Sequence, residues 1–438
     1  MSPINRLGQW PSGDNTGIIV ASTAIATAAL LTVLRNYLWP AQPKVLRSPL
    51  RTVLPKLSPD EFDKLEYKPD NFPGARDVET PYGSIRVYEW GPLTGDKVLF
   101  VHGISTSCIT LTKLANAFVN ERGCRVMLFD LFGRGYSDNP SDLPHDERLY
   151  TTQILLALAS SPDVSWTGPQ AFKLVGYSLG GGIAVHFATS FPHLVSSLLL
   201  LAPAGLIRPE SFGTVTRTAF TSDYIPWRFL RWVTSRRLKK PIRSQGKRGR
   251  RPNAKAATIT SPSSSSSSTL TTPSQTTPLL PPKPSDPIPS SGEDRFLLAE
   301  TTDPLMPLLR EPRNALEKRV LRAVHWQLAN HAGFVPAFMS CIRHAPLFDQ
   351  HASWAKLADR EPSTTCVVLG EEDELIDPED FRSDVGGLLG EGWDQEKITV
   401  VRVPGGHDFP MTFAGDVLGE VWRVWGWGER RVGEENGM

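Results

Sequence analysis

The stretch that decides the fold is residues 172–182, FKLVGYSLGGG. Its first part, Phe172–Tyr177, is an apolar run with the length of a buried strand, and small residues follow Ser178. A nucleophilic serine must stand clear of the sheet on a sharp strand-to-helix turn, which crowds the positions two residues away on each side. Gly176 and Gly180 occupy those positions. The stretch therefore predicts a strand, a nucleophile elbow with Ser178 at its tip, and a helix.

Further apolar runs on both sides of this stretch predict a sheet whose strands alternate with helices. The alternation favours the α/β fold class, with a doubly wound, mostly parallel sheet. Helices are expected at 111–121 and 181–190, among others. The expected strands are Ile85–Trp90, Lys97–Val101, Arg125–Phe129, Phe172–Tyr177, Val195–Ala202, Thr365–Leu369 and Ile398–Val403.

Two later strands are followed by residues suited to activating the serine. A serine hydroxyl is a poor nucleophile without a base, and the base needs an orienting acid. Asp373 follows one strand in GEEDELI, and His407 follows the last in PGGHDFP. Because active sites of open α/β sheets lie at the carboxyl ends of the strands, Ser178, Asp373 and His407 are predicted to converge as nucleophile, acid and base. Glu372 and Asp377, in the same acidic loop, are alternatives for the acid.

An oxyanion formed by attack on a carbonyl needs backbone N–H donors. One donor is expected from Leu179, directly after the serine. The second is expected from Ile104, in the loop after the strand that ends at Val101, with Ser105 as the alternative. His102 is expected to shape this loop and not to carry protons.

A long insertion interrupts the sheet pattern. Residues 211–238 and 312–351 have a helical sequence pattern and are rich in aromatic residues, so they predict a helical cap. Between them, residues 236–255 carry ten Lys or Arg and no Asp or Glu, and residues 256–292 hold 26 Ser, Thr or Pro. So little apolar surface cannot offset the entropy of ordering, and the insertion 239–292 is predicted to be disordered. Its basic part is a candidate for contact with anionic lipid.

An uncharged run near the N-terminus, GIIVASTAIATAALLTVL, covers residues 17–34. Its length is at the lower limit for crossing a hydrocarbon core of about 30 Å. A signal peptide would need a basic start and a shorter apolar core, and a mitochondrial presequence would be amphipathic, so a membrane anchor over residues 17–39 is favoured. Basic residues such as Arg35 and Lys44 follow the run. They predict a single-pass protein with a cytosolic catalytic part.

Composition sets the remaining limits. The chain has 438 residues, 40% of them hydrophobic, with 47 Lys and Arg against 46 Asp and Glu. The apolar fraction excludes a wholly disordered chain, and the balance of charge excludes a general nucleic-acid binder. The four cysteines form no CxxC pair and have no histidine at metal-ligand spacing. Because the predicted reaction uses only the chain's own side chains and amides, neither a metal nor an organic cofactor is expected. Cys124 and Cys366 are expected to be buried.

The predicted organisation is one α/β domain divided by the insertion. Its parts in chain order are an N-terminal tail (1–16), the membrane anchor (17–39), a linker (40–71), the first part of the core (72–206), cap helices (207–238), the disordered insertion (239–292), further cap helices (293–361) and the second part of the core (362–438).

Five motifs in order resemble those of the α/β-hydrolase superfamily. They are His102-Gly103, DLFGRGYSD from Asp130, GYSLGG around Ser178, GEED ending at Asp373 and GGHD around His407. The resemblance implies the α/β-hydrolase fold and serine hydrolysis, because epoxide hydrolases and haloalkane dehalogenases of this branch place Asp at the nucleophile position. With its anchor and aromatic cap, the chain looks like the membrane-anchored monoacylglycerol-lipase-like members.

The expected activity is therefore hydrolysis of lipid-like carboxylic esters through an acyl-enzyme on Ser178. Hydrolysis of an amide, a thioester or a carbon–carbon bond, and acyl transfer to an alcohol, use the same three residues and are alternatives. From a different class, a catalytically silent membrane scaffold is an alternative in which the basic and Ser/Thr-rich loop is the working part.

Overall fold

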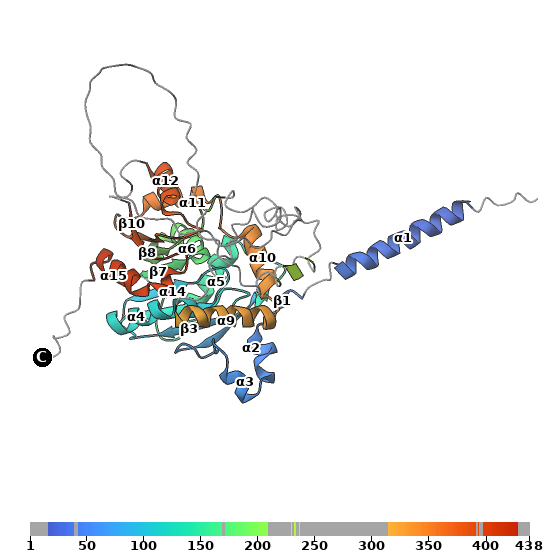
Figure 1. Ribbon diagram of the computed structural model, residues 1–438, viewed down its shortest axis with the longest axis horizontal. Coiled ribbons are helices and arrows are strands. Elements are labelled where there is room, and N and C mark those ends of the chain that lie inside the picture. Colours follow the sequence, from blue (N-terminus) through green and yellow to red (C-terminus); the bar gives the residue numbers. More distant parts are fainter. Residues whose placement is uncertain are drawn as a thin grey trace, which may run out of the picture. The chain divides into compact units, whose positions relative to one another are not determined.

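Figure 1 shows the computed structural model of the protein. Most of the predicted cap helices at 207–238, the predicted insertion at 239–292 and the first part of the cap segment 293–361 lie outside the residues that the structure describes. The described residues are 16–38, 43–168, 171–208, 229, 232–233, 236, 314–390, 393 and 397–427.

Eight strands form one mixed, mostly parallel sheet (Figure 1). The strands from β10 to β5 run parallel to one another, and β3 is antiparallel to both of its neighbours. In spatial order they are β10 (Ile398–Val403), β9 (Thr365–Gly370), β8 (Val195–Leu201), β7 (Phe172–Tyr177), β4 (Lys97–Val101), β5 (Arg125–Phe129), β3 (Gly83–Trp90) and β2 (Arg76–Thr80). This arrangement confirms the predicted fold class.

The predicted strands are all present, with small differences at their ends, but β2 was not predicted. Its sequence, RDVET, alternates between half-buried and exposed side chains at the edge of the sheet. An edge strand of this kind has no apolar run, which was the signal used for the others. By contrast, the central strands β4 and β5 are almost entirely buried.

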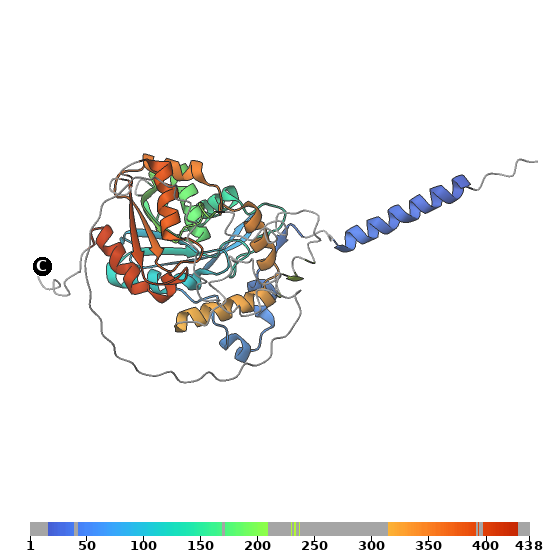
Figure 2. The same cartoon turned by 45° about the horizontal axis from the view of Figure 1, so that its top comes forward.

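Helices cover both faces of the sheet (Figure 2). On one face, α4 (Thr112–Arg122) packs against α15 (Ala414–Val424), and on the other, α5 (Glu147–Ala159) packs against α6 (Leu179–Ser190). The helix α6 begins at Leu179, two residues before the predicted start, because β7 ends at Tyr177 and Ser178 alone forms the turn as the N-cap residue.

The described part of the predicted cap forms α9 (Ala315–Asn330), α10 (Phe334–His344) and α11 (His351–Ala355). The side chain of Gln327 on α9 accepts a hydrogen bond from the amide of Gly135 at 2.6 Å, which joins this helix to the loop after β5. Because the rest of the insertion lies outside the described residues, a complete helical cap is not shown.

The N-terminal run forms α1 (Thr16–Leu38), which covers residues 17–38 of the anchor predicted at 17–39. Within the part of the chain that the structure describes, no helix is both long enough and apolar enough to cross a membrane. The membrane-spanning anchor is therefore not shown.

The predicted linker, residues 40–71, contributes short elements to the core. In it, β1 (Val45–Leu46) pairs antiparallel with β6 (Asn139–Pro140). Two helices follow, α2 (Pro49–Thr52) and α3 (Pro59–Asp63), and Tyr67 is buried. This segment therefore packs as part of the fold.

All four cysteines are free and buried. Burial raises the pKa of Cys124 and the pKa of Cys366, in each case to about 12. The expectation that these two thiols are buried, small apolar groups is confirmed.

Candidate active site

Ser178 stands on a strained turn between β7 and α6. Its φ is 55° and its ψ −120°, a left-handed conformation that residues other than glycine rarely adopt. Backbone hydrogen bonds hold it there, including a long one of 3.4 Å from the amide of Gly182 to the Ser178 carbonyl. The amide of Ser178 donates to Leu201 at 2.9 Å, and its carbonyl accepts from Gly181 at 2.8 Å and from Ala204 at 2.9 Å. The predicted elbow is thus present, with the hydroxyl at the carboxyl end of the sheet.

The crowding predicted on each side of Ser178 is also present. A Cβ atom at Gly176 would lie 2.4 Å from the carbonyl oxygen of Gly180. A Cβ atom at Gly180 would lie 2.2 Å from the carbonyl oxygen of Val101. Both positions therefore exclude any larger residue unless the backbone moves.

The structure brings Ser178, Asp373 and His407 together. The hydroxyl of Ser178 and Nε2 of His407 are 2.9 Å apart, and Nδ1 of His407 is 2.9 Å from Oδ2 of Asp373. A carboxylate only accepts, so Nδ1 carries the proton and Nε2 is left to accept from the serine. Asp373 is held in turn by the amides of Leu375 and Ile376, which donate to its Oδ1 at 2.8 and 2.9 Å.

The two alternative acids, Glu372 and Asp377, lie elsewhere in the loop. Asp377 accepts from the amides of Glu379 and Asp380 and so begins helix α12 (Pro378–Leu389). Glu372 is exposed. Of the three candidate acids, Asp373 is the one that bonds to the imidazole of His407.

His407 is buried, and its surroundings act on its pKa in opposite directions. Burial alone lowers the pKa, but the charge and hydrogen bond of Asp373, with smaller contributions from Glu374 and Asp408, raise it above its ordinary value. Sequence reasoning missed these two neighbours. It also missed Tyr177, whose hydroxyl donates to the His407 carbonyl at 2.9 Å. Each of these three residues is adjacent in sequence to a predicted site residue, and that adjacency is the sequence signal that could have identified them.

The loop after β4 lies against the serine. A Cβ atom at Gly103 would be 3.3 Å from Cβ of Ser178. His102, which begins this loop, accepts a hydrogen bond from the amide of Leu131 at 2.9 Å and donates from Nδ1 to the carbonyl of Gly103 at 2.9 Å. Burial lowers the pKa of His102 to about 3, so the ring is neutral. It ties the loops after β4 and β5 together, as expected of a residue that shapes the loop.

The amides predicted to bind an oxyanion have no other acceptor in the part of the chain that the structure describes. Among the described residues, no acceptor is bonded to the amide of Leu179 or to that of Ile104. Leu179 is also the first residue of α6, where the helix dipole favours negative charge. Both amides can therefore donate to a ligand, and their assignment to an oxyanion stays a prediction.

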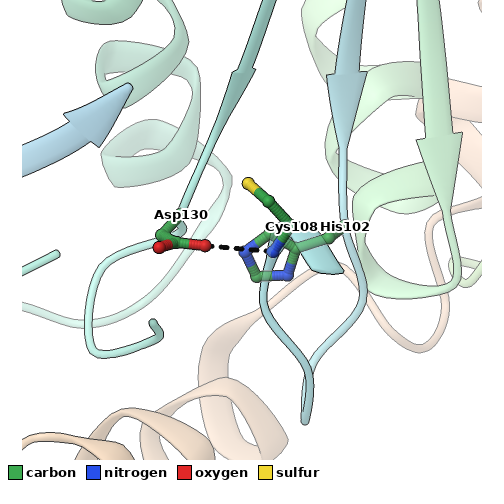
Figure 3. A group of neighbouring side chains, drawn as sticks. All are labelled: His102, Cys108 and Asp130. Atoms are coloured by element: carbon green, nitrogen blue, oxygen red, sulfur yellow. Dashed lines mark hydrogen bonds between the residues drawn. The ribbon is translucent and has the colours of Figure 1, made fainter. Parts of the chain in front are cut away.

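Figure 3 shows another cluster, made of His102, Cys108 and Asp130, whose ligand atoms lie within 4.8 Å of one another. The atoms are already engaged in hydrogen bonds. Asp130 accepts from the amides of Cys108 and Tyr136, both at 3.0 Å, and from the hydroxyl of Tyr67. A metal ion would have to displace these hydrogen bonds. The cluster is therefore better explained as a structural contact between the loops after β4 and β5 than as a metal site.

Comparisons with known proteins identify the family of this chain. A family model described as "alpha/beta hydrolase fold" matches residues 97–413. A serine hydrolase-like protein of Dictyostelium discoideum is 29% identical over 164 residues, which cover 35% of this chain and 44% of the relative. Protein phosphatase methylesterase 1 of Pongo abelii is 32% identical over 131 residues, 30% of this chain and 32% of the relative. The chain thus spans less than half the length of these curated relatives.

Solved structures with some similarity to this chain include a bacterial membrane phospholipase A and the esterase RhEst1 from a Rhodococcus species. The first is 15% identical, covers 93% of this chain and 96% of its own, and has a TM-score of 0.49. The second is 16% identical, covers 82% of this chain and 100% of its own, and has a TM-score of 0.48.

Proposed function

The chain belongs to the α/β-hydrolase family, and we propose that it is a serine esterase that hydrolyses lipid-like carboxylic esters. The observation that carries this proposal is the hydrogen-bonded row from Ser178 through His407 to Asp373, with 2.9 Å at each of the two bonds. The imidazole accepts from the hydroxyl and donates to the carboxylate, which is the arrangement that a base-activated nucleophile needs.

In the acylation step, Oγ of Ser178 attacks the ester carbonyl carbon while its proton passes to Nε2 of His407. The carbonyl electron pair moves to oxygen, and the amides of Leu179 and Ile104 donate to the resulting oxyanion. When the intermediate collapses, the bond to the leaving alcohol breaks and His407 gives its proton to that alcohol. The acyl group remains on Ser178.

Deacylation repeats these roles with water. His407 takes a proton from a water molecule as it attacks the acyl carbon, and returns the proton to Oγ of Ser178 as the acid leaves. Asp373 orients the imidazole and stabilises its positive charge in both steps. The chain's own residues thus provide each proton transfer.

The lipid-like substrate and a membrane location rest on α1. Its apolar side chains, including Val20, Ile25 and Leu30, are exposed, and basic residues follow the helix. Exposed apolar surface next to positive charge favours association with an anionic membrane surface. The double variant Ile25→Asp, Leu30→Asp should move the protein from the membrane fraction to the soluble fraction. Leu93→Asp, at an exposed leucine of the catalytic part, should not.

The experiment that tests the catalytic proposal compares the full chain with Ser178→Ala on esters of increasing acyl length. Loss of the nucleophile should lower kcat by about 10⁴-fold or more and abolish labelling by a fluorophosphonate probe. Ser353→Ala is a matched control, because Oγ of Ser353 also lies beside an imidazole, 3.4 Å from Nδ1 of His186. Labelling that survives in Ser178→Ala, or is lost in Ser353→Ala, would contradict the proposal.

Product analysis separates ester hydrolysis from the other reactions of the same three residues. Ester hydrolysis yields one acid and one alcohol. Acyl transfer to an added alcohol would yield a new ester, and preference for an amide, a thioester or a carbon–carbon bond would appear as a higher kcat/KM on that substrate.

A further inference from the structure

We propose that Arg134 is a positioning residue for the oxyanion-binding loop after β4, an inference that rests on the proposed esterase function. Arg134 lies in the loop after β5, and its side chain is 1% exposed. Its Nε donates to the carbonyl oxygen of Ile104, the residue whose amide is assigned to the oxyanion. The contact joins two loops at the carboxyl end of the sheet.

The rest of the guanidinium is held between these loops and α10. Its Nη1 lies 3.4 Å from the carbonyl oxygens of both Phe132 and Gly133. Its Nη2 lies 3.6 Å from Sγ of Cys341, and the group stacks on the ring of Phe334 with 5.3 Å to the centroid. Contacts on all sides leave the guanidinium one orientation, so the direction of its bond to Ile104 is set.

The bonds fix two successive peptide planes beside Ser178. In a trans peptide the C=O and the N–H point in opposite directions, so holding the oxygen also aims the amide. His102 holds the oxygen of Gly103 and thereby aims the amide of Ile104. Arg134 holds the oxygen of Ile104 and thereby aims the amide of Ser105, the alternative second donor. Whichever amide meets the oxyanion, Arg134 limits the rotation of the loop that carries it.

The charge of Arg134 adds to this effect. In the described part of the chain no carboxylate forms an ion pair with Arg134. Its neighbours are three buried, neutral imidazoles. Burial lowers the pKa of His102 and of His145 to about 3 and that of His331 to about 4, and the charge of Arg134 lowers all three. A buried positive charge without a carboxylate partner is costly, and it favours negative charge that develops nearby.

These features predict an effect on the chemical step and little effect on substrate binding, because the oxyanion exists only after attack. Arg134→Lys keeps the charge but cannot reproduce the fork of contacts. It should lower kcat by about 10- to 100-fold and change KM by less than about 3-fold, since removing an oxyanion donor outright costs about 10²- to 10³-fold. Arg134→Gln, which keeps an amide NH2 as donor and loses the charge, should lower kcat further.

Arg125→Lys is the matched control. Arg125 is the first residue of β5, the strand that precedes the Arg134 loop. It is also buried, and it donates to Glu89 at 3.1 Å. Both substitutions replace a buried guanidinium by an ammonium, so both should lower Tm. Only Arg134→Lys should lower kcat. The rate is divided by the concentration of sites that a fluorophosphonate labels, so that unfolded protein does not lower the measured kcat.

A second readout distinguishes positioning from a general structural role. An alkyl boronic acid forms a tetrahedral adduct with the serine, whereas a product acid binds without one. Arg134→Lys should weaken the boronic acid by the same factor as it lowers kcat/KM and leave the product acid unchanged. The inference is wrong if kcat falls equally in Arg134→Lys and Arg125→Lys. It is also wrong if the boronic acid has the same Kd for these two variants. Absence of Ser178-dependent ester turnover in the unaltered protein would instead overturn the proposed function, and the rate of fluorophosphonate labelling would still report on the loop.

Discussion

The carboxylate of Asp373 accepts a hydrogen bond from Nδ1 of His407 at 2.9 Å although the two residues are 34 positions apart. They meet because β9 and β10 are neighbouring parallel strands in which Gly370 is paired with Val403. Each residue follows its strand by a few positions, so both lie at the carboxyl end of the sheet. The nucleophile elbow directly after β7 lies at the carboxyl end of the sheet as well.

This pairing predicts the pH dependence of catalysis. Burial opposes protonation of His407, but Asp373 and the smaller contributions of Glu374 and Asp408 outweigh it, so the pKa of His407 is raised above its ordinary value. Only the neutral imidazole can accept the proton of Ser178. The value of kcat/KM should therefore be full at high pH and fall as the pH drops through a pKa above about 6.5. A profile with its acid limb below pH 6 would contradict this.

Replacing the acid should be far more damaging than replacing its neighbour in the loop. Asp373→Asn removes the charge and allows the wrong imidazole tautomer, so kcat should fall by about 10³- to 10⁴-fold with the fold retained. Asp377→Asn is the control, because Asp377 begins α12 through its bonds to Glu379 and Asp380. It should keep kcat and change the free energy of unfolding by less than about 1 kcal/mol. Steady-state kinetics measure kcat, and urea unfolding measures the free energy of unfolding, for each variant.

The elbow predicts a contrast between two glycine substitutions. Gly180→Ala would place Cβ 2.2 Å from the carbonyl oxygen of Val101, so the backbone must shift and both activity and stability should be lost, the latter by about 2 kcal/mol or more. Gly387→Ala, inside α12 with no atom within 4 Å of its Cβ, should keep activity and raise stability by about 0.5–1 kcal/mol. Equal effects at the two positions would argue against the close approach at the elbow.

The segment before α2 is held by one buried carboxylate. Asp138 accepts from the amide of Ser48 at 2.7 Å, from the amide of Ser84 at 3.0 Å and from the guanidinium of Arg47 at 2.8 Å. Asp138→Ala leaves these donors without their acceptor, so thermal or urea unfolding should show a loss of about 2–4 kcal/mol. Arg47 is half exposed, and Arg47→Ala should cost less than about 1 kcal/mol.

The candidate site was largely predictable because its residues follow recognisable strands. Ser178 and His407 each come after an apolar run of strand length, and the ends of parallel strands share one edge of the sheet. The choice among Glu372, Asp373 and Asp377 was less certain from sequence, since all three lie in one loop. Loop geometry decides it, because the amides of Leu375 and Ile376 turn Asp373 toward the imidazole.

The sequence by itself determined the α/β class, the central strands and the elbow, because each depends on a local pattern of apolar residues and glycines. Only the tertiary structure decided the edge strand β2 and the bond from Arg134 to Ile104. An edge strand is defined by the partner it pairs with, and its polar sequence carries no run to mark it. A buried guanidinium takes its place from the carbonyls and rings that surround it, and those come from segments far apart in the chain.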